Sequence, residues 1–297
     1  MHTPIRTRLS YILRSLTSEG RRNIFKGFAP WRRRVERRKS WLLTTDMEPR
    51  IQDVLSCPDL ESIARVPKAG SIENGILTMH NGLKVLAGSY SGDPMTKLLQ
   101  RTQGIHEPQE EKVFSQVLKH LAPQSSMLEL GAWWGFYSMW FQKELPKSQI
   151  YLIEPVQENL EFGKKNLALN GMQATFHHAF VNSESNDPPA GVPSITIDDA
   201  LKLFQIRHLS ILHCDIQGYE FAMLQGARNS LKSRAIDYFF ISTHTTNLHY
   251  ACLDSLRQAD YEILAQADML DTYSFDGLIA ARRRELQGCT PVTIALR

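Results

Sequence analysis

Short apolar runs alternate with amphipathic segments over most of residues 105–297. The apolar runs have the length of buried strands and lie at 126–131, 150–155, 174–181, 209–216 and 236–243. Segments between them, such as 157–171, place apolar residues at helical spacing. This alternation predicts an α/β domain with a mostly parallel sheet and helices on both faces. Strand-like pieces around Asp276-Gly277 predict an antiparallel edge to that sheet.

The preceding residues follow a different pattern. Asn81-Gly82 lies between two alternating runs and predicts a β-hairpin, because both turn residues tolerate a positive φ. Residues 88–99 contain two Gly, two Ser and one Pro and are interpreted as a loop. A helix is then predicted from Pro108, with Glu110 and Glu111 in its first turn, where they complement the positive end of the helix dipole.

Charge separates the N-terminal end from the rest of the chain. Residues 1–40 contain twelve Lys or Arg and two acids, a net charge of +10, whereas the remaining residues carry a net charge of −7. We therefore divide the chain into a basic arm (1–45), an N-terminal segment with the hairpin and a cap loop (46–104), and a main domain (105–297).

The arm has two interpretations. Its apolar residues at helical spacing are Ile5, Leu9, Ile12, Leu13 and Leu16, with arginines between them. Such a helix can lie on an anionic membrane face or meet an anionic partner. Alternatively, the arm is a solvated segment whose short helix packs on the main domain.

Composition places the chain among cytoplasmic proteins. Its four cysteines form no CxxC pair, which gives no sign of a zinc site or a disulfide framework. No stretch reaches the ~18 continuous apolar residues of a membrane span, and the N-terminus lacks the apolar region of a secretory signal. We expect a cytoplasmic protein whose arm can reach the inner face of the membrane.

A glycine turn, Gly131-Ala132-Trp133-Trp134-Gly135, follows the first strand of the predicted sheet. In open sheets of this kind a ligand binds at such a turn, beyond the carboxyl end of the strand. A dinucleotide-binding turn has a second glycine two residues after the first, which lets the helix N-terminus contact the phosphates. Trp133 occupies that position here and argues against a pyrophosphate cofactor. Taken alone, the two glycines also fit a simple strand-to-helix turn.

Two acids near this turn suit a nucleoside without phosphates. Glu154 ends the second strand, where an acid accepts both hydroxyls of an adenosine ribose. Glu129 precedes the turn by two residues and is expected to face an ammonium group. An adenosine that carries an amino acid in place of phosphates is S-adenosylmethionine, and the sequence predicts this cofactor.

Several ordered motifs resemble the FkbM family of S-adenosylmethionine-dependent methyltransferases. They are "GIHEPQEEKVF", "MLELGAWWGFYS", "IYLIEPVQENLEFGKKNLALNG", "ITIDDAL" and "LHCDIQGYEFAMLQGA", and the resemblance extends from about Gly82 to Arg282. It implies a class I methyltransferase (Rossmann-like) fold. It also implies O-methylation, often of sugar hydroxyls on glycolipids, surface polysaccharides or glycosylated natural products. Trp133 stands where family members often carry Asn.

The cofactor site is assigned to residues on these motifs. They are Glu129, Gly131, Ala132, Gly135, Ser138, Glu154, Pro155, Asn159 and Phe180. His177 and His178 alternate across a strand, so at most one of them faces the adenine, and Phe180 is expected as the ring neighbour.

Proton removal from an alcohol requires a base or a metal near the ends of the fourth and fifth predicted strands. General-base catalysis adds about 10²–10⁴ in rate. Asp215, at the end of the fourth strand, is the first candidate. His244, at the end of the fifth, is the second; its alternative role is a hydrogen bond beneath a loop. Glu220 is the third, or else a first-turn acid of its helix. As a set, these three are candidate ligands for Mg²⁺ or another hard divalent ion.

Three further motifs have structural interpretations. Asp198 and Asp199 match a family position, and helix capping accounts for Asp198. Glu107, in the "HEP" motif, lines the cleft or serves as a helix N-terminal acid. The stretch "NDPPA" (186–190) imitates a signature of nucleic-acid amino methyltransferases but lacks its aromatic residue, so we interpret it as a loop.

These features predict an S-adenosylmethionine-dependent O-methyltransferase with a sugar or other hydroxyl-bearing acceptor. Two alternatives from other classes stay open. The first is a nicotinamide-dependent oxidoreductase on a Rossmann-like sheet, against which Trp133 counts. The second is an RNA-binding or RNA-modifying protein that uses the basic arm. A tail alone binds nucleic acid in a salt-sensitive and unspecific way, so we do not expect a nucleic-acid partner. The sequence carries no signature of an oligomeric state.

Overall fold

The computed structural model describes residues 47–186 and 191–297. The predicted basic arm, including its helix, and part of the predicted "NDPPA" loop lie outside the described residues.

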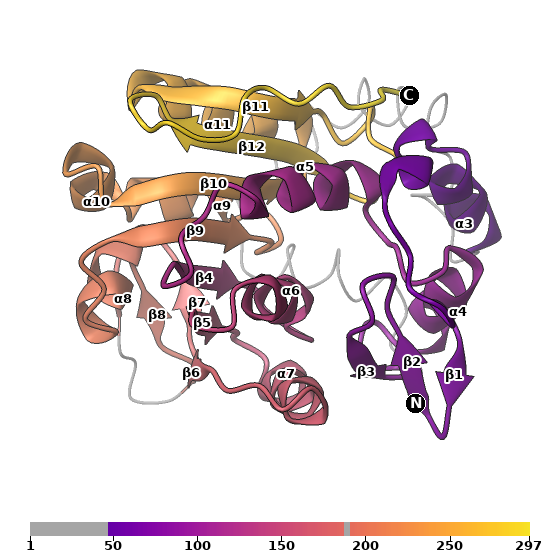
Figure 1. Cartoon of the computed structure of the whole chain (residues 1–297). Coiled ribbons are helices and arrows are strands. Elements are labelled where there is room, and N and C mark those ends of the chain that lie inside the picture. Colours follow the sequence, from indigo (N-terminus) through magenta and orange to yellow (C-terminus); the bar gives the residue numbers. More distant parts are fainter. Residues whose placement is uncertain (1–46, 187–190) are drawn as a thin grey trace, which may run out of the picture.

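A seven-stranded sheet forms the centre of this fold. Its strands are β4 (Ser126–Leu130), β5 (Gln149–Ile153), β6 (Thr175–His177), β9 (Leu209–Cys214), β10 (Ile236–Thr243), β11 (Tyr261–Ala267) and β12 (Gly277–Arg283). They are ordered β11-β12-β10-β9-β4-β5-β6 (Figure 1). The neighbours from β10 to β6 are parallel, whereas β12 is antiparallel to both β10 and β11. This is the class I methyltransferase fold, so the predicted fold class is confirmed.

Both faces of the sheet are buried, and the side chains of each strand alternate between two cores. On β10, Tyr238 and Phe240 belong to one core, whereas Phe239 and Ile241 belong to the other. The first core includes α5 (Pro108–Leu118), α6 (Phe136–Glu144) and α7 (Gln157–Leu169). The second includes α8 (Ile197–Leu203), α9 (Glu220–Gln225) and α11 (Thr246–Gln258), and α10 (Arg228–Lys232) contacts α8. This double burial explains why the strands read as nearly continuous apolar runs.

The strand-like pieces of the C-terminal tail form the antiparallel edge that the sequence predicted, because β11 and β12 pair antiparallel at one end of the sheet. β12 lies between β10 and β11, and β11 forms the edge. The position of β12 beside β10 was not predicted, because hydrophobic periodicity identifies a strand but not the strands with which it pairs. The predicted strand at 174–181 is also divided into β6 and β7 (Phe180–Val181), and β7 pairs with β8 (Ser194–Ile195) in a separate small sheet.

The segment before residue 105 covers the side toward which the arrowheads of β4 and β9 point (Figure 1). It contains α3 (Glu48–Leu55), the 3₁₀ helix η2 (Pro58–Ser62), β1 (Ile72–Glu73), β2 (Ile76–Thr78), β3 (Lys84–Leu86) and α4 (Asp93–Arg101). The predicted hairpin is confirmed, since β2 pairs antiparallel with β3 around Asn81-Gly82. The predicted loop at 88–99 is wrong in its second half, where Pro94 takes a first-turn position of α4.

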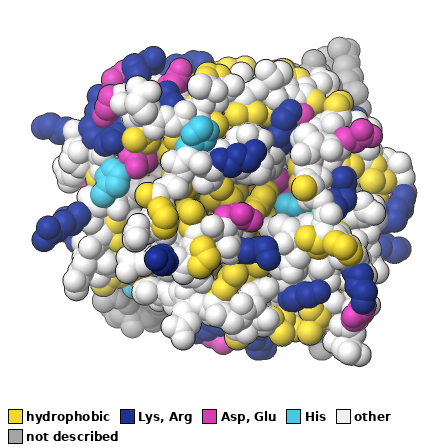
Figure 2. Space-filling model, viewed as in Figure 1, with side chains coloured by type: hydrophobic (Ala, Val, Ile, Leu, Met, Phe, Trp, Pro, Cys, Tyr) yellow, Lys and Arg dark blue, Asp and Glu magenta, His cyan; other side chains and the backbone are white. Residues whose placement is uncertain are grey.

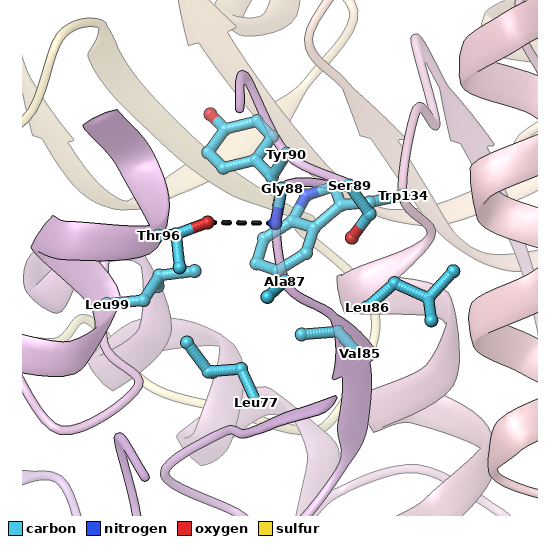
Figure 3. Close-up of a pocket in the computed structure, with 10 residues that line it drawn as sticks. All are labelled: Leu77, Val85, Leu86, Ala87, Gly88, Ser89, Tyr90, Thr96, Leu99 and Trp134. Atoms are coloured by element: carbon cyan, nitrogen blue, oxygen red, sulfur yellow. Dashed lines mark hydrogen bonds between the residues drawn. The ribbon is translucent and has the colours of Figure 1, made fainter. Parts of the chain in front are cut away.

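An aromatic stack connects the hairpin region to the main domain. The rings of Tyr90 and Trp134 lie 4.6 Å apart at an interplanar angle of 10°. Both residues line the apolar pocket of Figure 3, where the Gly88 amide donates to Oγ1 of Thr96 at 2.8 Å. This pocket has no room for a water molecule. The apolar core is continuous across residue 105, and the division at that residue stays a prediction.

The described surface carries no sign of a membrane span. Within 47–186 and 191–297, no helix combines the length and apolar character that crossing a bilayer requires. Figure 2 shows charges of both signs around a central group of hydrophobic side chains.

Candidate active site

The turn between β4 and α6 depends on glycine. Gly131 and Gly135 have φ values of +67° and +73°, which favour glycine. The amides of Gly131 and Ala132 donate to the carbonyl oxygen of Ile153 at 2.9 and 3.2 Å. A Cβ atom on Gly131 would lie 1.9 Å from the carbonyl oxygen of Asp215. The turn therefore lies directly against the end of β9.

Trp133 shapes the same turn through its backbone. Its φ is +40°, which is uncommon for a bulky residue. Its amide donates to Oε2 of Glu154 at 3.1 Å, and its ring packs edge-on against Tyr90 with centroids 5.3 Å apart. The Trp133 side chain, at the position of a second glycine, is thus packed as part of the turn.

Glu154 lies after β5, as predicted, and is 4% exposed. Its Oε1 atom accepts from the amide of Val156 at 2.9 Å and from Nδ2 of Asn159 at 3.3 Å. Burial raises the pKa of Glu154, although the hydrogen bonds from Val156 and Trp133 act in the opposite direction. Two bonds to Oε1 and one to Oε2 leave one of the four lone-pair sites of the carboxylate, on Oε2, for a ribose hydroxyl, and the predicted contact with both hydroxyls stays a prediction.

Glu129 is a buried residue of β4, and its carboxylate faces the first turn of α6. Its Oε2 atom accepts from the amide of Ser138 at 2.9 Å. Burial raises the pKa of Glu129, while the charge of His213 on the neighbouring strand and the bonds from α6 counter that rise. The helix N-terminus stabilises a carboxylate at this position. The predicted contact of Glu129 with an ammonium group stays a prediction.

The expected adenine side has an exposed apolar surface. Val156 and Phe180 are each 41% exposed, which is unusual for large apolar residues in this chain. His178 is already engaged, since its Nε2 atom donates to the carbonyl oxygen of Pro155 at 2.9 Å. Phe180 thus remains available for the predicted ring contact, and the assignment of the nine cofactor residues stays a prediction.

The three predicted catalytic residues lie together, because Asp215 and Glu220 both contact His244. Its Nε2 atom lies 3.2 Å from Oδ1 of Asp215, and its Nδ1 atom lies 2.7 Å from Oε1 of Glu220. Glu220 is fully buried and also accepts from the amide of Gly218 at 2.8 Å. Glu220 therefore does more than begin α9, because it orients the imidazole.

A fourth member of this cluster, Asp276, was missed as a site residue. Its Oδ1 atom lies 3.1 Å from Nε2 of His244. Asp276 immediately precedes β12, and β12 runs antiparallel to β10, so its start meets the end of β10. The Asp-Gly pair before an apolar run was the available signal, but its neighbours depend on the position of β12 in the sheet.

Charge accumulates around the imidazole. Burial alone would lower the pKa of His244, but the charges of Asp276 and Glu220, with the contacts to Asp215 and Glu220, raise it well above its usual value. These contacts favour the protonated form of the ring. The role of Asp215 as the base stays a prediction.

The acids Glu110 and Glu111 lie in the first turn of α5, as predicted, and they are also buried. Oε1 of Glu110 lies 2.8 Å from Nε2 of His213, and its Oε2 atom accepts from Oγ of Ser242 at 3.2 Å. Oε1 of Glu111 lies 2.8 Å from Nδ1 of His106. The helix faces the sheet here, so its acids pair with buried histidines.

Glu107 belongs to the same buried network. Its Oε2 atom accepts from the hydroxyl of Tyr137 at 3.0 Å and lies 3.2 Å from Nε2 of His106. Arg50 extends the network, because its NH2 nitrogen donates to the carbonyl oxygen of His106 at 3.1 Å. Glu107 is 7% exposed, so most of its surface faces protein.

The two acids of the "ITIDDAL" motif have structural contacts. Asp198 accepts from the amides of Asn229 and Ser230 at 2.9 and 2.8 Å, at the start of α10. Capping thus accounts for Asp198, as predicted, but on α10 rather than on its own helix. Thr196 caps α8 by accepting from the amide of Asp199 at 3.1 Å.

Comparisons with known proteins found one matching family model. Residues 172–263 match the model of the Methyltransferase FkbM domain, and this segment contains Asp215, Glu220 and His244. The match confirms the family resemblance seen in the sequence. No curated protein matches the chain.

Solved structures that match part of the chain include the following three proteins. TrmK of M. capricolum, in complex with S-adenosyl-homocysteine, has 16% identity and a TM-score of 0.38, with 57% of this chain and 67% of that chain covered. Precorrin-6y C5,15-methyltransferase of Geobacter metallireducens GS-15 has 14% identity and a TM-score of 0.40, with 59% and 87% covered. The ribosomal protein L11 methylase of Lactobacillus delbrueckii subsp. bulgaricus has 10% identity and a TM-score of 0.41, with 61% and 81% covered.

The family match over residues 172–263 and the strand order together support an S-adenosylmethionine-dependent methyltransferase. They do not favour the nicotinamide-dependent oxidoreductase.

Proposed function

We propose that this methyltransferase acts on a hydroxyl oxygen and that the acceptor is a carbohydrate. The placement of Asp215 carries the proposal. Its backbone carbonyl lies against Gly131 in the predicted cofactor turn, and its carboxylate lies beside His244. A hydroxyl that approaches the donor from this side meets a proton acceptor.

The reaction breaks the bond between the sulfonium sulfur and its methyl carbon and forms a carbon–oxygen bond. The products are S-adenosylhomocysteine and a methyl ether, and the hydroxyl proton passes to Asp215. General-base catalysis of this kind supplies about 10²–10⁴ in rate. Alignment of donor and acceptor supplies about 7–11 kcal/mol in well-oriented systems. His244, held by Glu220, is a positioning residue for Asp215.

The rim of the site suits a sugar. Nε2 of Gln217 donates to Oδ1 of Asp215 at 3.1 Å, which places an amide beside the predicted base. Tyr219 is 36% exposed at the start of α9. Sugar rings offer hydroxyls to amides and C–H faces to aromatic rings. The family resemblance implies the same acceptor class.

The basic arm offers a way to reach a surface-bound acceptor. Its role rests on the +10 charge of residues 1–40, which lie outside the described residues. We expect the full chain to sediment with anionic vesicles, and a variant that lacks residues 1–40 to stay in the supernatant. Equal sedimentation with anionic and neutral vesicles would count against this role.

The acceptor class is tested by methyl labelling. The purified chain is incubated with S-adenosylmethionine labelled in its methyl group and with fractionated glycans from its host. We expect the label in a sugar methyl ether that survives mild base, and label that forms about 10²–10⁴ times more slowly with Asp215→Asn. Label confined to RNA or to protein side chains would overturn the proposal.

A further inference from the structure

Asp215, His244 and Asp276 form a cluster with the composition of a metal site. Asp215 follows β9, His244 follows β10 and Asp276 precedes β12, and these strands are neighbours in the sheet. One ligand atom from each residue lies within 4.8 Å of the others. We propose that the three side chains bind one divalent transition-metal ion, with Mn²⁺ preferred over Mg²⁺. The inference rests on the proposed function in one respect, because it concerns the side from which the acceptor enters.

The spacing of the ligand atoms fits an ion between them. Nε2 of His244 lies 3.2 Å from Oδ1 of Asp215 and 3.1 Å from Oδ1 of Asp276. Two ligands at right angles, each about 2.1–2.2 Å from an ion, are about 3.0–3.1 Å apart. The imidazole nitrogen therefore has the separation of a neighbouring ligand from each of the two oxygens, and one ligand atom of each carboxylate lies within 4.8 Å of the other.

The Nε2 atom of His244 is directed into this cluster. The imidazole is nine-tenths buried, and among the described residues its Nε2 atom makes no hydrogen bond. Both carboxylate oxygens are near it, yet neither has the alignment that a hydrogen bond from the ring requires. Buried ring nitrogens normally make a well-aligned hydrogen bond, whereas Nε2 has only the two poorly aligned carboxylate contacts, an arrangement that suits an ion between the three groups.

The opposite side of the ring has the arrangement found behind metal-bound histidines. Nδ1 lies 2.7 Å from Oε1 of Glu220, and that oxygen also accepts from the amide of Gly218. A metal-binding histidine usually donates its other N–H to a carboxylate, which fixes the tautomer and directs the lone pair at the ion. Glu220 was predicted as a ligand, but the geometry assigns it this supporting position and assigns the third ligand to Asp276.

The donor set determines which ion is preferred. Mg²⁺ prefers oxygen ligands and retains its waters, whereas an imidazole nitrogen favours ions of the transition series. One histidine with two carboxylates therefore favours Mn²⁺ over Mg²⁺. An ion at this position supplies Lewis-acid stabilisation to the acceptor oxygen.

Direct binding to the full chain tests the site without an activity assay. The protein is stripped with a chelator and titrated with MnCl₂, while the electron paramagnetic resonance signal of free Mn²⁺ reports uptake. We expect one ion per chain, tighter binding than MgCl₂ in competition, and at least tenfold weaker binding for Asp276→Asn. Loss of a supporting carboxylate typically lowers metal affinity about 10–100-fold, which is expected for Glu220→Gln. Asp254→Asn, an exposed change on α11, is the matched control and should bind normally.

The outcomes separate this site from the proposed function. Circular dichroism and S-adenosylmethionine binding show whether each variant is folded. Failure of the wild-type chain to take up Mn²⁺ at millimolar concentration, or equal affinity in folded Asp276→Asn, would overturn the metal site. Hydroxyl methylation that persists in chelator would then leave the proposed function intact. Tight Mn²⁺ uptake with no methylation of any glycan would instead support the site and contradict the acceptor class.

Discussion

Gly131 lies so close to Asp215 that a single added carbon would overlap the carbonyl oxygen of the aspartate, at 1.9 Å. The turn that is predicted to receive the donor and the strand end that carries the predicted base are thus in direct contact. A change at one of them must disturb the other.

Gly131→Ala should therefore destabilise the fold and abolish S-adenosylmethionine binding. Gly171→Ala is a matched control, because Gly171 has nearly the same φ (+65° against +67°) but nothing within 4 Å of its added carbon. Left-handed backbone alone costs a non-glycine residue about 1–2 kcal/mol. Urea denaturation should show a loss of that size for Gly171→Ala and a clearly larger one for Gly131→Ala. Equal losses would show that the close approach is unimportant.

Asp215→Asn should lose catalysis while it keeps the cofactor. An amide cannot take the hydroxyl proton, so we expect turnover to fall by about 10²–10⁴. The dissociation constant for S-adenosylmethionine, measured by calorimetry, should change only a few-fold. Undiminished turnover in this variant would remove Asp215 from its role as base.

Glu154→Gln tests the predicted grip on the ribose. A hydrogen bond to a charged acceptor contributes about 1.5–3 kcal/mol, which corresponds to about 10- to 150-fold in affinity. Calorimetry should show a loss of S-adenosylmethionine affinity in this range. Glu161→Gln, an exposed change on α7, should bind the cofactor normally. Unchanged affinity in Glu154→Gln would place the ribose elsewhere.

The buried pair of His106 and Glu111 predicts a pH dependence of stability. Burial alone would lower the pKa of His106, but the charges and hydrogen bonds of Glu107 and Glu111 raise it from 6.5 to about 10. The folded chain thus keeps a proton that the unfolded chain releases near pH 6.5. The stabilisation is fully present below pH 6.5 and declines as the pH rises towards about 10.

Urea denaturation from pH 6 to 10 tests this relation. The free energy of unfolding of the wild-type chain should fall steadily across that window. His106→Gln should be less stable at pH 6 and should show a shallower decline. Parallel curves for the two proteins would mean that His106 does not titrate abnormally.

Asp198→Ala should affect stability but not chemistry. Its carboxylate accepts from two amides at the start of α10, and loss of a helix cap costs about 1 kcal/mol. Thermal denaturation should show this loss while turnover per folded molecule stays at the wild-type level. A large fall in turnover would assign the family position a direct role.

Local patterns predicted the parts of the site that are close in sequence. The strand, turn and helix around Gly131 were predictable because apolar periodicity and glycine spacing act over a few residues. Asp215 and His244 were predictable because each follows an apolar run, and the ends of parallel strands meet at one edge.

Long-range packing determined what the sequence did not predict. Asp276 joins the cluster only because β12 inserts beside β10, and no local pattern encodes that choice. The sequence places Glu110 and Glu111 in the first turn of a helix but does not predict their burial. They are buried because α5 faces histidines from distant segments, His213 and His106.

The late position of β12 also bears on how the enzyme is made. A nascent chain on the ribosome completes Gly131, Glu154, Asp215 and His244 before Asp276 emerges. Until β12 arrives, one edge of β10 presents unpaired backbone groups, which invite association with other chains. When β12 pairs with β10, the backbone groups of this edge are satisfied, and Asp276 comes next to His244. Protection from aggregation and assembly of the cluster are therefore completed together.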